Sequence, residues 1–180
     1  MRADAQRSRA RVLRAADAVF NARGAGASTE EVARVAGVGV ATVFRHFPTK
    51  QALLEAVVHT RLEALLAAGR ALAATGGPDG FYTLFAHLID GAVAKRAIGD
   101  VLLGGSEAFR DSSYALAADL WALFDELMAS AKAAGQLRPD LDTDDLQAIL
   151  AGVHQSLLQA AGDRARQARL ADVVLRGLRP

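Results

Sequence analysis

The chain has 180 residues, of which 52% are hydrophobic, a formal net charge of +1 and no cysteine. This length fits one domain, or a small domain fused to a larger one, and the apolar content is sufficient for a buried core. Without cysteine there is no disulfide or thiolate chemistry. The sequence shows neither a signal peptide nor an apolar run of membrane-spanning length, so the expected location is the cytoplasm and no membrane partner is expected.

The charges are distributed unequally along the chain. Residues 1–50 contain nine Lys or Arg and four Asp or Glu, whereas residues 51–180 contain twelve and sixteen. A basic end joined to an acidic body is typical of a protein that meets a polyanion at one end only. The arginines near the amino terminus either follow a DNA backbone or form a solvated end, and they are Arg2, Arg7, Arg9, Arg11 and Arg14.

Two short helices are predicted after an amphipathic first helix, RVLRAADAVFNARG. Ser28 and Glu31 have the spacing of a capping box, which satisfies free amides at a helix start. Gly37 can adopt the left-handed conformation that ends many helices. A second helix then starts at Val40, with Val43 turned inward. Because helices this short cannot bury a core alone, the pattern predicts a helix-turn-helix at about residues 28–47, whose second helix is presented to the DNA major groove.

Long helices fill the rest of the chain. Pro48 is suited to the start of a helix that runs from Lys50 to about Ala74, and GGPDG ends that helix. The remaining predicted helices are Gly80–Arg96, Val101–Phe109, Tyr114–Ala134, a helix from Asp142 or Thr143 to about Ala161, and Asp163–Leu178.

Residues 8–68 resemble the DNA-binding domain of the TetR/AcrR family of transcriptional regulators. The resemblance rests on the first helix and on STEEVARVAGVGVATVFRHFPTKQALLEAVV. It implies an all-α fold, with an N-terminal three-helix helix-turn-helix domain over 8–68 joined to a helical ligand-binding and dimerisation domain over 69–180. It also implies a homodimer that binds a near-palindromic operator, acts as a repressor and is released by a small apolar or aromatic ligand, with no cofactor.

The same resemblance assigns DNA contacts to particular residues. Phosphate-backbone contacts are assigned to Thr29, Phe44, His46 and Lys50. Base contacts are assigned to Val40, Ala41, Thr42 and Arg45. Relatives commonly have Tyr at the position of Phe44 and polar residues at those of Gly39 and Val40, so fewer hydrogen-bonding groups remain here. Arg45 is therefore the main candidate for direct contact with a base, and Val40 or Ala41 could contact thymine methyl groups.

Two further sets of residues are predicted from apolar and aromatic spacing. The dimer interface is expected on the last two helices, at Leu146, Ile149, Leu150, Val153, Leu157, Leu170, Val174 and Leu178. A ligand cavity is expected to be lined by Phe81, Phe85, Leu88, Phe109, Trp121, Phe124, Met128 and His154. For both sets the alternative is that the same side chains pack the core of one protomer.

Two other functions remain as alternatives. One is a DNA-binding regulator without a small ligand, controlled by a protein partner or by its abundance; a tightly packed interior would favour it. The other is a helical enzyme, for which the sequence offers little. The four histidines lack metal-ligand spacing, and GVGVAT fails as a dinucleotide motif because it follows a helix and lacks the last glycine.

Overall fold

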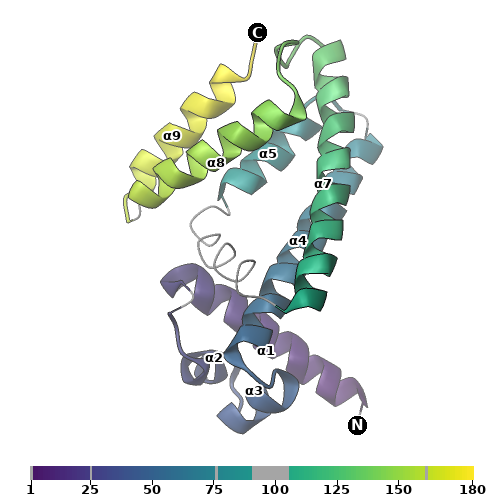
Figure 1. Cartoon of the computed structure of the whole chain (residues 1–180). Coiled ribbons are helices and arrows are strands. Elements are labelled where there is room, and N and C mark those ends of the chain that lie inside the picture. Colours follow the sequence, from purple (N-terminus) through teal and green to yellow (C-terminus); the bar gives the residue numbers. More distant parts are fainter. Residues whose placement is uncertain (1, 25, 76, 91–105, 161) are drawn as a thin grey trace. The chain divides into compact units, whose positions relative to one another are not determined.

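Helical caps and apolar faces account for the architecture of the chain. The computed structural model describes residues 2–24, 26–75, 77–90, 106–160 and 162–180, and these contain helices and no strand (Figure 1). The helices are α1 (Arg2–Arg23), α2 (Thr29–Ala36), α3 (Val40–His46), α4 (Lys50–Thr75), α5 (Gly80–Asp90), α7 (Glu107–Ala133), α8 (Thr143–Gln159) and α9 (Arg164–Gly177). This confirms the all-α prediction. None of the described helices has the length and apolarity needed to cross a membrane.

The described residues form two compact units. The amino-terminal unit comprises those of Met1–Arg61 and Ala94–Ser113, and the carboxy-terminal unit comprises those of Leu62–Val93 and Tyr114–Pro180. The helices α4 and α7 each contribute residues to both units.

The turn between α2 and α3 forms as the sequence predicts. The Ser28 hydroxyl accepts a hydrogen bond from the Glu31 amide at 3.2 Å. Gly37 adopts φ 64° and ψ 40°, and its amide bonds back to the Ala33 and Arg34 carbonyls. This left-handed residue closes α2 and lets the chain reverse into α3. The Glu31 carboxylate forms ion pairs with Arg23 at 3.2 Å and Arg34 at 3.6 Å.

The helix α4 starts at the residue that the sequence predicts. The Thr49 hydroxyl accepts a hydrogen bond from the Ala52 amide at 3.0 Å, and the helix begins at Lys50. Pro48 therefore lies outside the helix, immediately before the capping residue Thr49. A threonine hydroxyl satisfies an otherwise free amide of the first turn, which a proline side chain cannot do.

Apolar packing and two polar contacts hold α4 in the amino-terminal unit. The buried residues of this unit's helices include Val12, Phe20, Val32, Val43, Phe47, Leu53 and Val57. The Arg61 guanidinium forms an ion pair with Asp17 of α1 and also donates to the Asp17 carbonyl at 3.2 Å. The Glu55 carboxylate accepts hydrogen bonds from the Ser106 amide at 2.9 Å and hydroxyl at 3.3 Å, just before α7 begins.

The helix α7 is continuous where the sequence predicts a break. Residues 101–105 of the predicted helix Val101–Phe109, like residues 91–96 of the predicted Gly80–Arg96, lie outside the described residues. Phe109 and Tyr114, however, belong to one helix, so their assignment to separate helices is wrong. The Ser112 hydroxyl donates to the Phe109 carbonyl at 3.0 Å, and Ser113 is buried. A serine bonded to the preceding turn in this way is compatible with a continuous helix.

Aromatic rings fill the core of the carboxy-terminal unit. Phe124 of α7 meets Phe81 and Phe85 of α5 edge to face, with ring centroids 6.2 and 6.4 Å apart. Trp121 lies 5.5 Å from Phe124 by the same measure. Edge-to-face pairs at these distances add to the stabilisation that burial already provides. Leu146, Leu150, Val153 and Leu157 of α8 belong to the same core cluster.

Gly69 allows α4 to approach α5 and α7 closely. A Cβ built at Gly69 would lie 2.5 Å from Cδ2 of Leu123 and 2.9 Å from Cδ2 of Leu84. Leu84 and Leu123 are both buried, so neither side chain can turn into solvent.

Replacing Gly69 by valine is expected to destabilise the protein by about 1–3 kcal/mol, the usual cost of overpacking a core. Chemical denaturation measures this loss. The matched control is Ala71→Val, on the exposed face of the same helix, which should cost about 0.5 kcal/mol through helix propensity alone. Equal stabilities of the two variants would contradict the close approach at Gly69.

Candidate nucleic-acid interface

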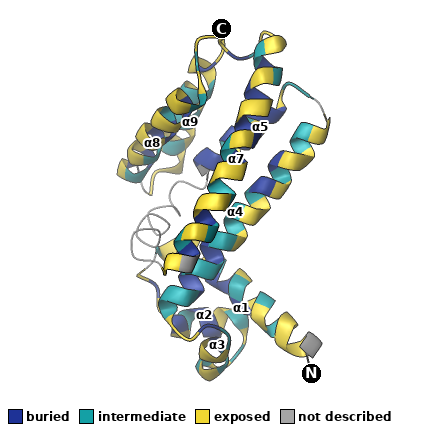
Figure 2. Cartoon of the chain, turned by 45° about the vertical axis from the view of Figure 1, so that its right-hand side comes forward, coloured by how far each residue is buried: buried dark blue, intermediate teal, exposed yellow. Residues whose placement is uncertain are grey.

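The second helix of the helix-turn-helix presents one face to the outside. Val43 and Phe47 are buried and anchor α3 to the unit. The outward positions are the exposed residues Ala41, Phe44 and Arg45, and the half-buried residues Val40, Thr42 and His46. Figure 2 shows the alternation of buried and exposed positions along these short helices.

The acidic side chain of Glu30, at the start of α2, interacts with the positive charge of Lys50, at the start of α4. The pKa of the exposed Glu30 carboxyl lies below its ordinary value, chiefly because of its backbone amide at the start of α2, then because of the Ser28 hydroxyl. The Thr29 hydroxyl and the charge of Lys50 lower this pKa further. Thr29 itself is only 7% exposed, and Lys50 is half-buried. The proximity of Glu30 to Lys50 was not visible in the sequence, because it joins two helices.

One ring nitrogen of His46 is buried. Its Nε2 has no hydrogen-bond partner among the described residues and almost no contact with solvent. The His46 ring also lies beside Phe47, with 6.4 Å between ring centroids. A phosphate contact from this side chain, as the resemblance implies, would therefore use Nδ1.

The helix α1 brings a further cation to the end of α3. The Arg9 guanidinium carbon lies 4.9 Å from the centroid of the Phe47 ring, within the range of a cation–π interaction. Arg11 and Arg14 are also exposed on α1, whereas Arg7 is paired with Asp4 at 2.6 Å. Arginine enrichment suggested a role for this segment, but only the fold places Arg9 on the ring that anchors α3.

The residues predicted to line a ligand cavity separate into two groups. Phe81, Phe85, Leu88, Phe124 and Met128 are buried in one core cluster of the carboxy-terminal unit, with Trp121 packed against it. His154, in the same unit, is half-buried, with Nε2 3.4 Å from the Leu88 carbonyl oxygen. Phe109 belongs to the amino-terminal unit. The four aromatic residues of this set in the carboxy-terminal unit, Phe81, Phe85, Trp121 and Phe124, thus pack against one another.

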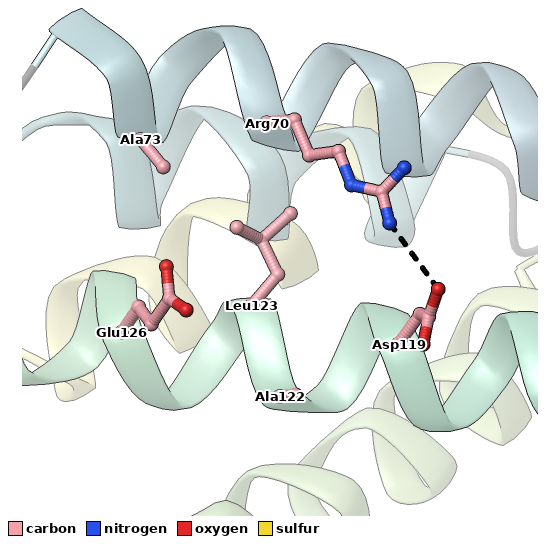
Figure 3. A pocket seen from close by; sticks show the side chains of 6 residues that line it. All are labelled: Arg70, Ala73, Asp119, Ala122, Leu123 and Glu126. Carbon is pink, nitrogen blue, oxygen red and sulfur yellow. Dashed lines mark hydrogen bonds and ion pairs between the residues drawn. The ribbon is translucent and has the colours of Figure 1, made fainter.

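An open groove of about 360 Å³ lies between α4 and α7. Figure 3 shows Leu123 between the charged side chains of the groove, with Arg70 paired to Asp119 at 3.2 Å. Ala73, Ala122 and Glu126 complete the lining. The lining of this groove includes charged side chains, whereas the sequence predicts a cavity lined mainly by apolar and aromatic residues. In the described part of the chain, no group of His, Asp or Glu residues could hold a metal ion.

The residues predicted for the dimer interface mostly face inward. Five of the eight are buried within the protomer: Leu146, Leu150, Val153, Leu157 and Leu178. Ile149, Leu170 and Val174 are partly buried and pack against the same core. Val173, on α9, is 67% exposed. The five buried side chains thus pack the protomer's own core, the alternative that the sequence left open.

A helix-turn-helix with an exposed second helix, joined to a second helical unit, defines a DNA-binding regulator of transcription. Residues 12–57 match the family model described as "Bacterial regulatory proteins, tetR family", and residues 78–180 match "Transcriptional regulator SbtR-like, C-terminal domain". The chain belongs to the TetR family of transcriptional regulators, and it is a regulator rather than an enzyme.

Two solved structures illustrate the similarity. A TetR transcription regulatory protein from Mycobacterium vanbaalenii is 36% identical, with 99% of each chain covered and a TM-score of 0.73. A TetR transcriptional regulator from Streptomyces coelicolor is 35% identical, with 96% of this chain and 98% of that chain covered and a TM-score of 0.74. Among curated proteins, none matches the sequence significantly.

Proposed function

We propose that the protein is a homodimeric repressor that binds a near-palindromic operator through residues 8–68 and is regulated through residues 69–180. The observation that carries the proposal is the outward face of α3, with Arg45 exposed and Val43 and Phe47 fixing the helix from behind. A single short recognition helix provides little affinity, so two half-sites are needed for specific binding. Selection of bound fragments from random DNA tests this proposal by the symmetry of the sites recovered.

The residues that contact DNA divide into two roles. Arg45, Thr42, Ala41 and Val40 approach base edges in the major groove. Lys50, His46 through Nδ1 and the amino-terminal end of α2 at Thr29 face the sugar–phosphate backbone. Because the Thr29 side chain is buried, its contribution is assigned to the backbone amide at a helix start, where free amides favour phosphate.

Lys50→Ala is expected to weaken binding to all DNA sequences about equally, because a phosphate contact carries no sequence information. The slope of log affinity against log salt should fall by about 1 for each phosphate interaction that is removed. Fluorescence anisotropy at several salt concentrations measures both effects. Arg70→Ala removes one positive charge from the carboxy-terminal unit and is the matched control, with no change of slope expected. An unchanged slope for Lys50→Ala would remove this lysine from the interface.

Dimerisation is assigned to the outer faces of α8 and α9. The residues with apolar surface still available there include Val173 and the partly buried Ile149, Leu170 and Val174. The molecular mass in solution, by light scattering, tests this assignment with Val173→Asp as the variant. A protomer mass for the unaltered chain would contradict it.

Release by a small apolar or aromatic ligand is the first of two candidate modes of regulation. It is supported by the aromatic character of the carboxy-terminal unit, and thermal-shift screening against apolar compounds tests it. The second candidate is regulation by a protein partner or by abundance. The edge-to-face packing of Phe124 with Phe81 and Phe85 favours this second mode, because rings that contact one another leave less surface for a ligand between α5 and α7.

A further inference from the structure

The outward face of α3 carries an apolar stripe formed by Val40, Ala41 and Phe44. Phe44 is 41% exposed, Ala41 is exposed and Val40 is half-buried. These positions fall on one side of the helix, since residues three and four apart are neighbours on a helix surface. Because α3 is anchored by the buried side chains of Val43 and Phe47, it cannot rotate to bury the stripe within the unit.

The stripe lies among groups suited to a polyanion. Arg45 is exposed beside Phe44, Arg9 is held over Phe47 at the end of α3, and Lys50 begins the next helix. The surface is therefore continuous with the proposed DNA interface, and duplex DNA is the partner that fits its charge.

Apolar surface of this kind has one matching group in the major groove. Among the base edges exposed there, only thymine presents a methyl group, at C5. A hydrogen-bonding side chain finds no partner in that methyl group, whereas a valine, alanine or phenylalanine side chain can remove it from water. A phenylalanine cannot hydrogen-bond a phosphate, so its ring is free to serve this purpose.

We propose that the apolar stripe recognises thymine methyl groups, with Phe44 as the main specificity-determining residue. This inference rests on the proposed operator binding and refines it. Thymine contacts would set the preferred half-site alongside the contact made by Arg45, and the preference would persist at high salt because it does not depend on charge.

The test uses a duplex recovered by selection from random DNA, with thymine replaced by deoxyuridine one position at a time. Uracil keeps the hydrogen-bonding groups of thymine and lacks only the methyl group. We expect about a threefold to fivefold loss of affinity at a contacted thymine in one half-site, as for one methyl group returned to water, and about tenfold or more when both half-sites are changed. Thymines outside the half-sites are the internal control.

Two protein variants show which side chain is responsible for the loss of affinity on uracil substitution. In Phe44→Ala the uracil penalty should disappear, whereas in Arg45→Ala it should persist on a weaker background. Because Phe44 is exposed, its replacement should leave the melting temperature nearly unchanged, which a thermal scan verifies.

Half-sites that lack thymine, or uracil substitutions without effect at every position, would overturn the inference while leaving operator binding intact. If Phe44→Ala weakens binding but keeps the uracil penalty, the ring lies on the backbone and the assignment is also overturned. Failure to recover any symmetric site would instead refute the proposed function.

Discussion

Replacing Phe124 by alanine is expected to lower the free energy of unfolding by about 3–5 kcal/mol, as for a phenylalanine removed from a packed core. The Phe124 side chain is fully buried and contacts the rings of Phe81, Phe85 and Trp121. Denaturant unfolding at a fixed protomer concentration measures the loss, since dimer formation would make apparent stability depend on concentration.

The size of this loss also separates the two candidate modes of regulation. Tyr114→Ala on the same helix, at a position 65% exposed, is the control and should change stability by less than about 0.5 kcal/mol. A loss near the expected value means that the rings pack against one another. A loss of less than about 1 kcal/mol would contradict that packing, because a ring that borders an internal space has fewer neighbouring atoms to lose when it is removed. That result would favour a ligand cavity.

Replacing Arg45 by alanine is expected to reduce the affinity for the specific site by about 1–3 kcal/mol per half-site, which is the worth of a good bidentate contact to a base. In a homodimer the loss occurs twice. Binding to unrelated DNA should weaken much less, so the ratio of specific to non-specific affinity falls, and the base preference at one position of each half-site relaxes. Competition binding against a panel of single-base variants measures this ratio.

Arg45→Lys separates charge from geometry. Lysine keeps the positive charge but lacks the planar fork that pairs with two acceptors at once. Non-specific affinity should therefore stay close to that of the unaltered protein, while the base preference is lost. If Arg45→Lys retained the full preference, Arg45 would be acting as a simple phosphate contact and the assignment of base recognition to it would be refuted.

Much of the amino-terminal unit could be predicted from the sequence because its signals are local. The capping role of Ser28, the left-handed Gly37 and the inward Val43 depend on residues a few positions apart, and the structure confirms each. The contacts that were missed join distant parts of the chain. Arg9 over Phe47, and Glu55 with Ser106, could be found only after folding had brought the helices together.

The carboxy-terminal unit was less predictable, because its packing also depends on contacts between distant parts of the chain. Apolar spacing on α8 shows that one face is buried, but it does not show whether the neighbour belongs to the same protomer. Leu146 and Leu157 are buried within the protomer, so this apolar spacing reflects the protomer's own core. Similarly, aromatic spacing on α5 and α7 is the same for rings that line a cavity and rings that fill it. The sequence predicts a break between Phe109 and Tyr114, yet α7 continues through these residues.

We propose that the chain binds DNA as a two-fold symmetric dimer through the exposed face of α3. The most direct measurement is selection of bound fragments from random duplex DNA with the full-length protein, followed by sequencing. We expect a near-palindromic site whose two half-sites are about one helical turn or a multiple of it apart, and whose enrichment is lost in Arg45→Ala. Enrichment of no sequence, or of a site without two-fold symmetry, would contradict it.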